Sequence, residues 1–286
     1  MGEMPETTIP LSVRIELCRA GLQVIADGLG IRMLHIKGAT LDARIRPDAR
    51  EGSDVDVIVD PRRVVEMHRA LLAHGWTVYS TFDEGSPFGH AQTYWHPDWG
   101  YIDLHRRFPG IGLADATAFD VLARDSSAST AAGLDLVVPE LAAQGALFLL
   151  NAARGSQGDR DAALAFRRGL AAEQLRSIDQ LVSELHAEVA ASVVTGELEN
   201  WHGHRDYRLW RAVSQGGTRT QEWWGRVRAA RSPQEAMQVV LRAPRVNRSR
   251  LAHQLGRTPT WRDVAMAAVR RGGRALRDLV PGWGTR

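Results

Sequence analysis

The chain has 286 residues, which is enough for one large domain or two modest ones with a sizeable apolar core. Its apolar fraction of 44% and charged fraction of 24% are ordinary for a globular protein, and a single cysteine, Cys18, excludes an internal disulfide. No apolar stretch is long enough for a membrane span, and the N-terminal residues lack the pattern of a secretion signal. We therefore expect a cytoplasmic protein without membrane insertion.

The net charge of +3 conceals an asymmetry along the chain. From Asn200 onward there are 18 arginines and 5 acidic residues, a net charge of +13, whereas the preceding part carries −10. Six of the nine tryptophans lie in the same basic segment. An acidic part joined to a basic part indicates different partners for each.

Periodicity and turn residues predict a mixed set of elements up to residue 105. In chain order these are a helix at 11–28, a strand at 33–36, a turn at Lys37-Gly38 with a short helix from Ala39, a strand at 55–59, a helix from Pro61 to His74, and strands at 76–80, 91–95 and 101–105. Gly85 to Gly89 and Pro97 to Gly100 mark the loops between the last three strands.

Beyond Phe108 the pattern changes, and from Ala114 onward it predicts helices that end near Gly133, Gly155 and Gly196. The expected fold class is α+β, a small mixed sheet flanked by helices and followed by an α-helical domain. We expect three parts: a core at 1–112, a helical domain at 113–199 and a basic helical segment at 200–286.

Carboxylates at the predicted strands are the main candidates for chemistry. Asp54 and Asp56 share one face of a strand because side chains alternate, and Asp103 and His105 share a face of a later strand. If the two strands are neighbours, three carboxylates converge, at a cost in free energy unless a cation lies between them. Hard oxygen ligands of this kind suit two Mg²⁺ ions, and Mn²⁺ also fits.

The motifs Leu34-His35-Ile36-Lys37-Gly38, Arg50, Ser53-Asp54-Val55-Asp56-Val57-Ile58-Val59 and Ile102-Asp103-Leu104-His105 resemble the polymerase-beta-like nucleotidyltransferase superfamily. Within it the sequence is most similar to the "uncharacterised nucleotidyltransferase" family, which has Lys-Gly where better-known members have Gly-Ser. The resemblance implies transfer of a nucleoside monophosphate from a nucleoside triphosphate (NTP), with release of pyrophosphate. It implies Asp54, Asp56 and Asp103 as metal ligands. The two-ion chemistry itself suggests that Asp103 bridges the second ion or accepts the hydroxyl proton.

Supporting residues each have a structural alternative. Lys37 is the only lysine of the chain, and with Gly38 it is expected at the triphosphate, although a strand-end charge beside a turn glycine is the alternative. Arg50 either reaches the triphosphate or is a solvated loop arginine. Ser53 is expected to hydrogen-bond near Asp54, and His105 either orients a metal ligand or is a structural histidine.

Three functions are compatible with the sequence. The first is nucleotidyl transfer to a hydroxyl of a small molecule or peptide. The second is transfer to RNA, such as a tRNA 3′ end, held by the basic segment from Asn200. The third is a non-catalytic nucleotide-binding module. Residues Trp261 to Leu279 form an amphipathic basic pattern that suits nucleic acid, an anionic membrane surface or an acidic partner, or simply a solvated helix face.

Overall fold

The computed structural model describes residues 9–45, 52–83, 88–230, 232–242, 246 and 248–279. The chain divides into two compact units, which we describe separately. The first comprises Met1–Val78, Ala91–Arg107 and Ala114–Gln144, and the second comprises Tyr79–His90, Phe108–Leu113 and Gly145–Arg286.

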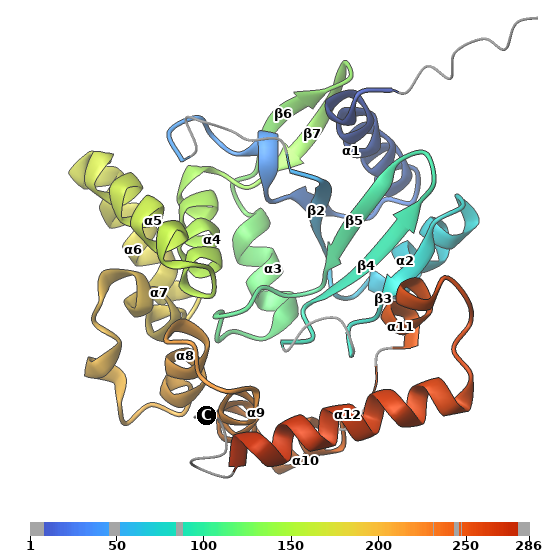
Figure 1. Ribbon diagram of the computed structural model, residues 1–286. Coiled ribbons are helices and arrows are strands. Elements are labelled where there is room, and N and C mark those ends of the chain that lie inside the picture. Colours follow the sequence, from blue (N-terminus) through green and yellow to red (C-terminus); the bar gives the residue numbers. More distant parts are fainter. Residues whose placement is uncertain are drawn as a thin grey trace, which may run out of the picture. The chain divides into compact units, whose positions relative to one another are not determined.

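The first unit is built on a mixed five-stranded sheet. Its strands are β1 (Met33–His35), β2 (Asp54–Val59), β3 (Thr77–Ser80, whose residues from Tyr79 onward are assigned to the second unit), β4 (Ala91–His96) and β5 (Gly100–His105), in the spatial order β1-β2-β5-β4-β3. β2 and β5 run parallel, whereas β1 pairs with β2 and β4 pairs with β5 in antiparallel fashion (Figure 1). The predicted α+β class is therefore confirmed, and β5, the last strand of the sheet in chain order, lies beside β2.

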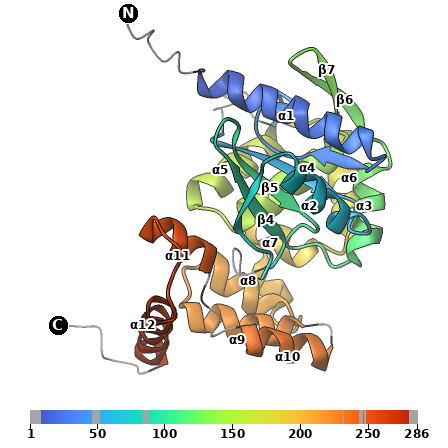
Figure 2. The same cartoon turned by 90° about the vertical axis from the view of Figure 1, so that its right-hand side faces the viewer.

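Two helices, α1 (Leu11–Gly28) and α2 (Val64–Ala73), cover one face of this sheet (Figure 2). The core there joins apolar residues of both helices to the alternate residues Val55, Val57 and Val59 of β2. Each such fully buried aliphatic side chain contributes about 1.5–3 kcal/mol. Cys18 belongs to this core, and burial raises its pKa to about 12, which disfavours the reactive thiolate. Because side chains alternate, the acidic residues of β2 point to the opposite face.

Helix α2 begins three residues later than the sequence pattern predicted. The backbone N–H of Arg62 donates to Asp60 Oδ1 over 3.0 Å, and that of Arg63 donates to the carbonyl of Asp60 over 2.8 Å. These bonds hold residues 61–63 in a turn, so Pro61 precedes the helix instead of opening it.

A second correction concerns residues 127–138, where the sequence pattern predicted helix. The structure has a two-stranded hairpin there, β6 (Ser127–Ala131) and β7 (Leu134–Val138), which packs beside α1 and β1 (Figure 2). Ala132 and Gly133 form its two-residue turn with φ of 48° and 78°, the geometry that joins twisted antiparallel strands. Of the three glycines predicted to end helices, Gly133 therefore turns a hairpin, and Gly155 and Gly196 follow helix ends.

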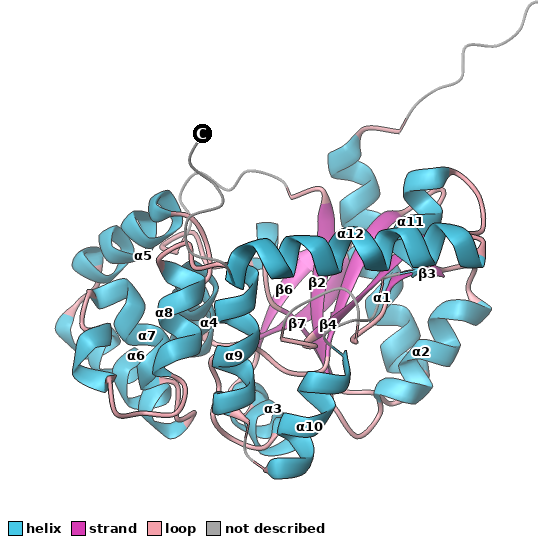
Figure 3. Cartoon of the chain, turned by 60° about the horizontal axis from the view of Figure 1, so that its bottom comes forward, coloured by secondary structure: helices cyan, strands magenta, loops and turns pink. Residues whose placement is uncertain are grey.

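The remaining helices are α3 (Asp115–Ala123) in the first unit, α4 (Leu141–Ala153), whose residues from Gly145 onward belong to the second, and then α5 (Gln157–Gly169), α6 (Ala172–Glu184), α7 (Glu188–Thr195), α8 (Tyr207–Ser214), α9 (Arg219–Ala229), α10 (Pro233–Arg242), α11 (Arg248–Leu255) and α12 (Trp261–Leu279). Short 3₁₀ turns occur at Gly38–Thr40 and Leu198–Trp201. From residue 145 onward the described residues form helices and loops without strands (Figure 3). Among the described helices, none combines the length and hydropathy that a bilayer crossing requires.

Candidate metal centre

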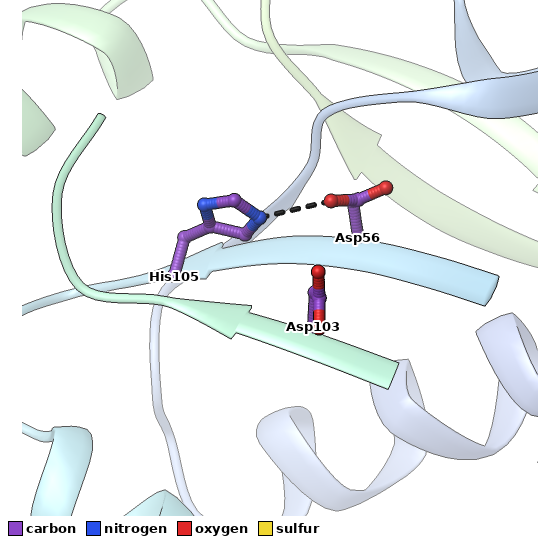
Figure 4. Close-up of side chains that lie close together, drawn as sticks. All are labelled: Asp56, Asp103 and His105. Atoms are coloured by element: carbon purple, nitrogen blue, oxygen red, sulfur yellow. Dashed lines mark hydrogen bonds and ion pairs between the residues drawn. The ribbon is translucent and has the colours of Figure 1, made fainter. Parts of the chain in front are cut away.

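Three carboxylates lie on one face of the sheet, on two adjacent parallel strands. Asp54 and Asp56 belong to β2 and Asp103 to β5, and the register places Asp56 directly beside Asp103. The strand adjacency on which the predicted convergence depended is thus present. Figure 4 shows Asp56 and Asp103 rising from neighbouring strands, with the ring of His105 turned toward Asp56. One ligand atom from each of these three residues lies within 4.8 Å of the other two.

Asp56 is the most enclosed of the carboxylates, with 8% of its surface exposed. Its Oδ1 accepts hydrogen bonds from Lys37 Nζ over 2.5 Å and from His105 Nε2 over 2.9 Å. Both bonds fall on Oδ1, so Oδ2 accepts no hydrogen bond from the described residues. Burial acts to raise the pKa of Asp56, but the hydrogen bond from His105 and the charge of Lys37 outweigh it and hold that pKa below its usual range.

His105 is fully buried, and burial lowers its pKa, with the nearby Lys37 charge acting in the same direction. The neutral ring then donates its Nε2–H to Asp56. This arrangement fixes the orientation of the carboxylate, as a histidine beside a metal ligand does in many metal sites. The predicted orienting role for His105 remains a proposal, but the residue it contacts is Asp56, from the neighbouring strand.

Asp54, at the start of β2, is half-buried and carries the clearest sign of excess negative charge. Burial raises its pKa to about 6, and the charges of Asp56 and Asp103 act in the same direction, against a smaller lowering by Lys37. The one lysine therefore leaves the three-carboxylate cluster under-neutralised. A divalent cation would remove this repulsion, and carboxylate oxygens are the ligands that Mg²⁺ prefers. The donor set thus fits the metal that the sequence resemblance implied.

Lys37 and Gly38 form the turn after β1. Gly38 has a φ of +74°, a backbone conformation that favours glycine, and a Cβ atom there would also displace the guanidinium of Arg19, whose Nη2 would lie 2.5 Å away. Thr40 Oγ1 donates to the carbonyl of Lys37 over 2.9 Å and holds the turn closed. With the ammonium bound to Asp56, Lys37 lies at the carboxylate cluster, on the side where the predicted triphosphate contact would be made.

Of the two other predicted site residues, the structure describes only Ser53. Ser53 is exposed in the bend before β2, next to Asp54. Arg50 lies outside the described residues, so its predicted triphosphate contact stays a prediction.

Thr93 on β4 is a site residue that sequence reasoning missed. Its Oγ1 donates to Asp103 Oδ1 over 2.6 Å, because Thr93 is the direct partner of Asp103 in the antiparallel β4–β5 pair. The bond fixes one oxygen of that carboxylate. The tight turn between the two predicted strands would have revealed the pairing, had the register been counted back from it.

Behind the carboxylate face, His35 of β1 is buried to 1% exposure, and neither of its ring nitrogens has a hydrogen-bond partner among the described residues. Burial lowers its pKa to about 3, helped by the positive charge of Arg19, which is itself buried on α1. Neither residue was assigned a role from the sequence. His35 is thus a buried, neutral histidine at the end of β1, two residues before Lys37.

This burial predicts an acid-dependent loss of stability. Below about pH 6.5 His35 is protonated in the unfolded state, whereas in the folded state it stays neutral down to about pH 3. The free energy of unfolding therefore falls as the pH drops through this window. The slope is at most roughly 1.4 kcal/mol per pH unit. Replacement by leucine (His35→Leu) should flatten the curve, giving a relative gain of about 2 kcal/mol between pH 6.5 and pH 5. Urea unfolding of both proteins across this range measures the difference, and parallel curves would contradict it.

Comparisons with known proteins add little to this geometry. No protein-family model and no curated protein sequence matches the chain. Among solved structures, it is similar to the antibiotic-resistance factor ANT(2'')-Ia, with 13% identity, a TM-score of 0.37, and coverage of 66% of this chain and 93% of that one. It is also similar to the lincosamide antibiotic adenylyltransferase LnuA bound to lincomycin, with 16% identity, a TM-score of 0.31, and coverage of 59% of this chain and 95% of that one. A tRNA-processing enzyme is similar at 11% identity and a TM-score of 0.28, with coverage of 97% of this chain and 93% of that one. Similarity at this level does not define an activity, and the side chains of the carboxylate cluster carry the functional proposal.

Proposed function

We propose that the protein is a Mg²⁺-dependent nucleotidyltransferase that moves a nucleoside monophosphate from an NTP to a hydroxyl group of a small molecule or peptide. The observation that supports this most directly is the meeting of Asp56 and Asp103 on adjacent strands, beside Asp54, whose pKa is raised by burial and by the charges of these two residues. Two carboxylates that meet, a third on the same face two residues earlier on β2, and a lysine bonded to Asp56 suit a site that binds divalent cations and polyanionic phosphates.

Asp54, Asp56 and Asp103 would hold the cations. When bound, Mg²⁺ would supply charge neutralisation for the triphosphate and lower the pKa of the attacking hydroxyl. His105 keeps the Asp56 carboxylate in place by its hydrogen bond, and Thr93 does the same for Asp103. Both acidic groups are therefore held before substrate arrives, which reduces the reorganisation that the reaction requires.

The reaction is an in-line displacement at the α-phosphorus. The hydroxyl oxygen of the acceptor forms a bond to the α-phosphorus while the bond from that phosphorus to the bridging oxygen breaks, and pyrophosphate leaves with the electron pair. The hydroxyl proton passes to Asp103, which accepts a hydrogen bond from Thr93 on one oxygen. Lys37, at the turn beside the cluster, contributes a positive charge toward the triphosphate.

RNA is a second candidate acceptor, favoured by one observation, the net charge of +13 from Asn200 onward. The third possibility, a module that binds nucleotide without turnover, is disfavoured because three carboxylates kept together without a chemical use would cost stability.

Labelled nucleotides test the proposal. We expect the full-length protein with Mg²⁺ to transfer label from an α-³²P-labelled NTP to one fraction of a cell extract, and to transfer none from the γ-labelled NTP. Label in the small-molecule or peptide fraction supports the main proposal, and label in RNA supports the alternative. Label from the γ-phosphate, or transfer that persists in EDTA, would overturn nucleotidyl transfer. If no fraction is labelled with any NTP, while Mg²⁺ and a non-hydrolysable NTP still raise the melting temperature, the protein is a binding module.

A further inference from the structure

Helix α12 carries large apolar side chains in solvent. Trp261 is 75% exposed, Met266 52% and Val269 74%. Seven of the nine large apolar side chains that are at least half exposed in the described residues lie beyond residue 220; they are Trp224, Met237, Val240, Leu241, Trp261, Met266 and Val269. Exposed apolar surface therefore accumulates in the same segment that carries the positive charge, and such accumulation marks an interaction surface.

The exposed side chains of α12 follow a helical stripe. Trp261, Ala265 and Val269 are spaced by four residues and share one face of the helix, and all three are exposed. Val264 and Ala268 are half-buried on the adjacent face, and α12 contacts α9 of the same unit. In the structure, α12 thus uses a different part of its surface for packing and leaves the Trp261–Val269 stripe uncovered.

Arginines lie directly beside this stripe. The guanidinium of Arg262 lies 5.5 Å from the ring centroid of Trp261, and Nη2 of Arg270 lies 3.7 Å from the sulfur of Met266. Both arginines are exposed. Cationic and apolar groups are therefore interleaved on one surface, which needs a partner with negative charge and an apolar layer close together.

The start of the helix is fixed in advance. Thr260 and Asp263 cap it reciprocally, with Thr260 N–H donating to Asp263 Oδ2 over 2.8 Å and Asp263 N–H donating to Thr260 Oγ1 over 3.3 Å. Asp263 also forms an ion pair with Arg257 over 2.7 Å, so this acidic residue is neutralised locally. Trp261 is consequently held at the first position of a formed helix, and little ordering is needed on binding.

From these observations we propose that α12 binds the surface of an anionic lipid bilayer. Trp261, Met266 and Val269 would enter the boundary between headgroups and acyl chains, and Arg262 and Arg270 would meet lipid phosphates. RNA phosphates would satisfy the arginines but leave Val269 and Met266 in water. A second copy of the chain would bring two segments of net charge +13 together, which opposes self-association.

Vesicle co-sedimentation with the full-length protein tests this. We expect binding to phosphatidylglycerol-containing vesicles to be about tenfold or more stronger than to pure phosphatidylcholine vesicles, and to weaken with salt. Val269→Asp should reduce it by about tenfold without unfolding the protein, because the side chain is mostly exposed. Arg270→Gln should lower binding to the anionic vesicles by several-fold. Val65→Asp on α2, at a site 61% exposed, is the matched control and should bind as the unchanged protein does.

Three results would overturn the proposal. One is equal binding to both vesicle types. Another is normal vesicle binding by Val269→Asp with the helix content unchanged by circular dichroism. The third is that the protein does not bind vesicles and instead binds tRNA, or forms a concentration-dependent dimer, and that Val269→Asp abolishes this other interaction.

Discussion

Replacing Asp54 by asparagine should abolish nucleotidyl transfer while making the metal-free protein more stable. An asparagine side chain cannot supply the charge that divalent cations require, so the rate should fall by about 10³-fold or more, the scale of losing several kcal/mol of charge stabilisation. The raised pKa of Asp54 shows that its ionised form is disfavoured by burial and by the charges of Asp56 and Asp103. At pH 7.5, above that pKa of about 6, removing the charge should therefore add about 1 kcal/mol, a figure reduced for the partial exposure of the side chain.

The measurements are α-label transfer and urea unfolding of the metal-free protein. Asp98→Asn makes the same chemical change in the β4–β5 turn, where the side chain is 76% exposed, and should alter neither quantity. Retained transfer in Asp54→Asn would remove the catalytic assignment. A large loss of stability would instead show that the cluster is not under-neutralised in the metal-free protein.

Asp56→Asn should inactivate the protein and also destabilise it, by about 2 kcal/mol. Asp56 is the buried acceptor for both Lys37 and His105, and removing its charge leaves the ammonium without its counter-charge. For a protein of this size the melting temperature should fall by roughly 5 °C. The two substitutions should therefore have opposite effects on stability. Asp56 is held by two hydrogen bonds, whereas Asp54 is destabilised by burial and by neighbouring carboxylates.

A matched control separates instability from loss of chemistry. Asp60, at the end of the same strand, is 6% exposed and paired with Arg32 and Arg62 over 2.8 Å each, so Asp60→Asn should lose comparable stability yet keep its transfer activity. A double-mutant cycle between Asp56→Asn and Lys37→Met should show a coupling of about 1–2 kcal/mol. Additive effects would mean that the ion pair contributes nothing to the folded state.

The sequence was sufficient for those parts of the fold that depend on local alternation. Asp54 and Asp56 alternate with Val55 and Val57, so the pattern alone places the two carboxylates on one face of β2 and the valines on the other. The sequence did not predict that β2 pairs with β5, and the convergence of the carboxylates depended on that pairing. Parallel strands 47 residues apart have no local sequence pattern that reveals their pairing.

What the sequence could not reveal were contacts that depend on register and distance. The Thr93–Asp103 bond requires the β4–β5 register, and the Lys37–Asp56 ion pair requires the end of β1 to bring an ammonium within 2.5 Å of a carboxylate on β2. The β6–β7 hairpin was missed because Ser127–Ala131 is short, small and polar, and because a glycine that ends a helix looks the same in sequence as one that turns a hairpin.

The ion pair between Lys37 and Asp56 also bears on the order in which substrates load. The ammonium acts as a resident counter-ion for Asp56, and its three N–H donors allow it to contact a phosphate oxygen while it stays bonded to the carboxylate. A divalent ion bound through Oδ2 of Asp56 would leave this ion pair in place but would lie close to the positive charge of the ammonium. The resting protein should therefore bind a divalent ion more tightly together with nucleotide than alone, because the triphosphate adds negative charge beside the ammonium.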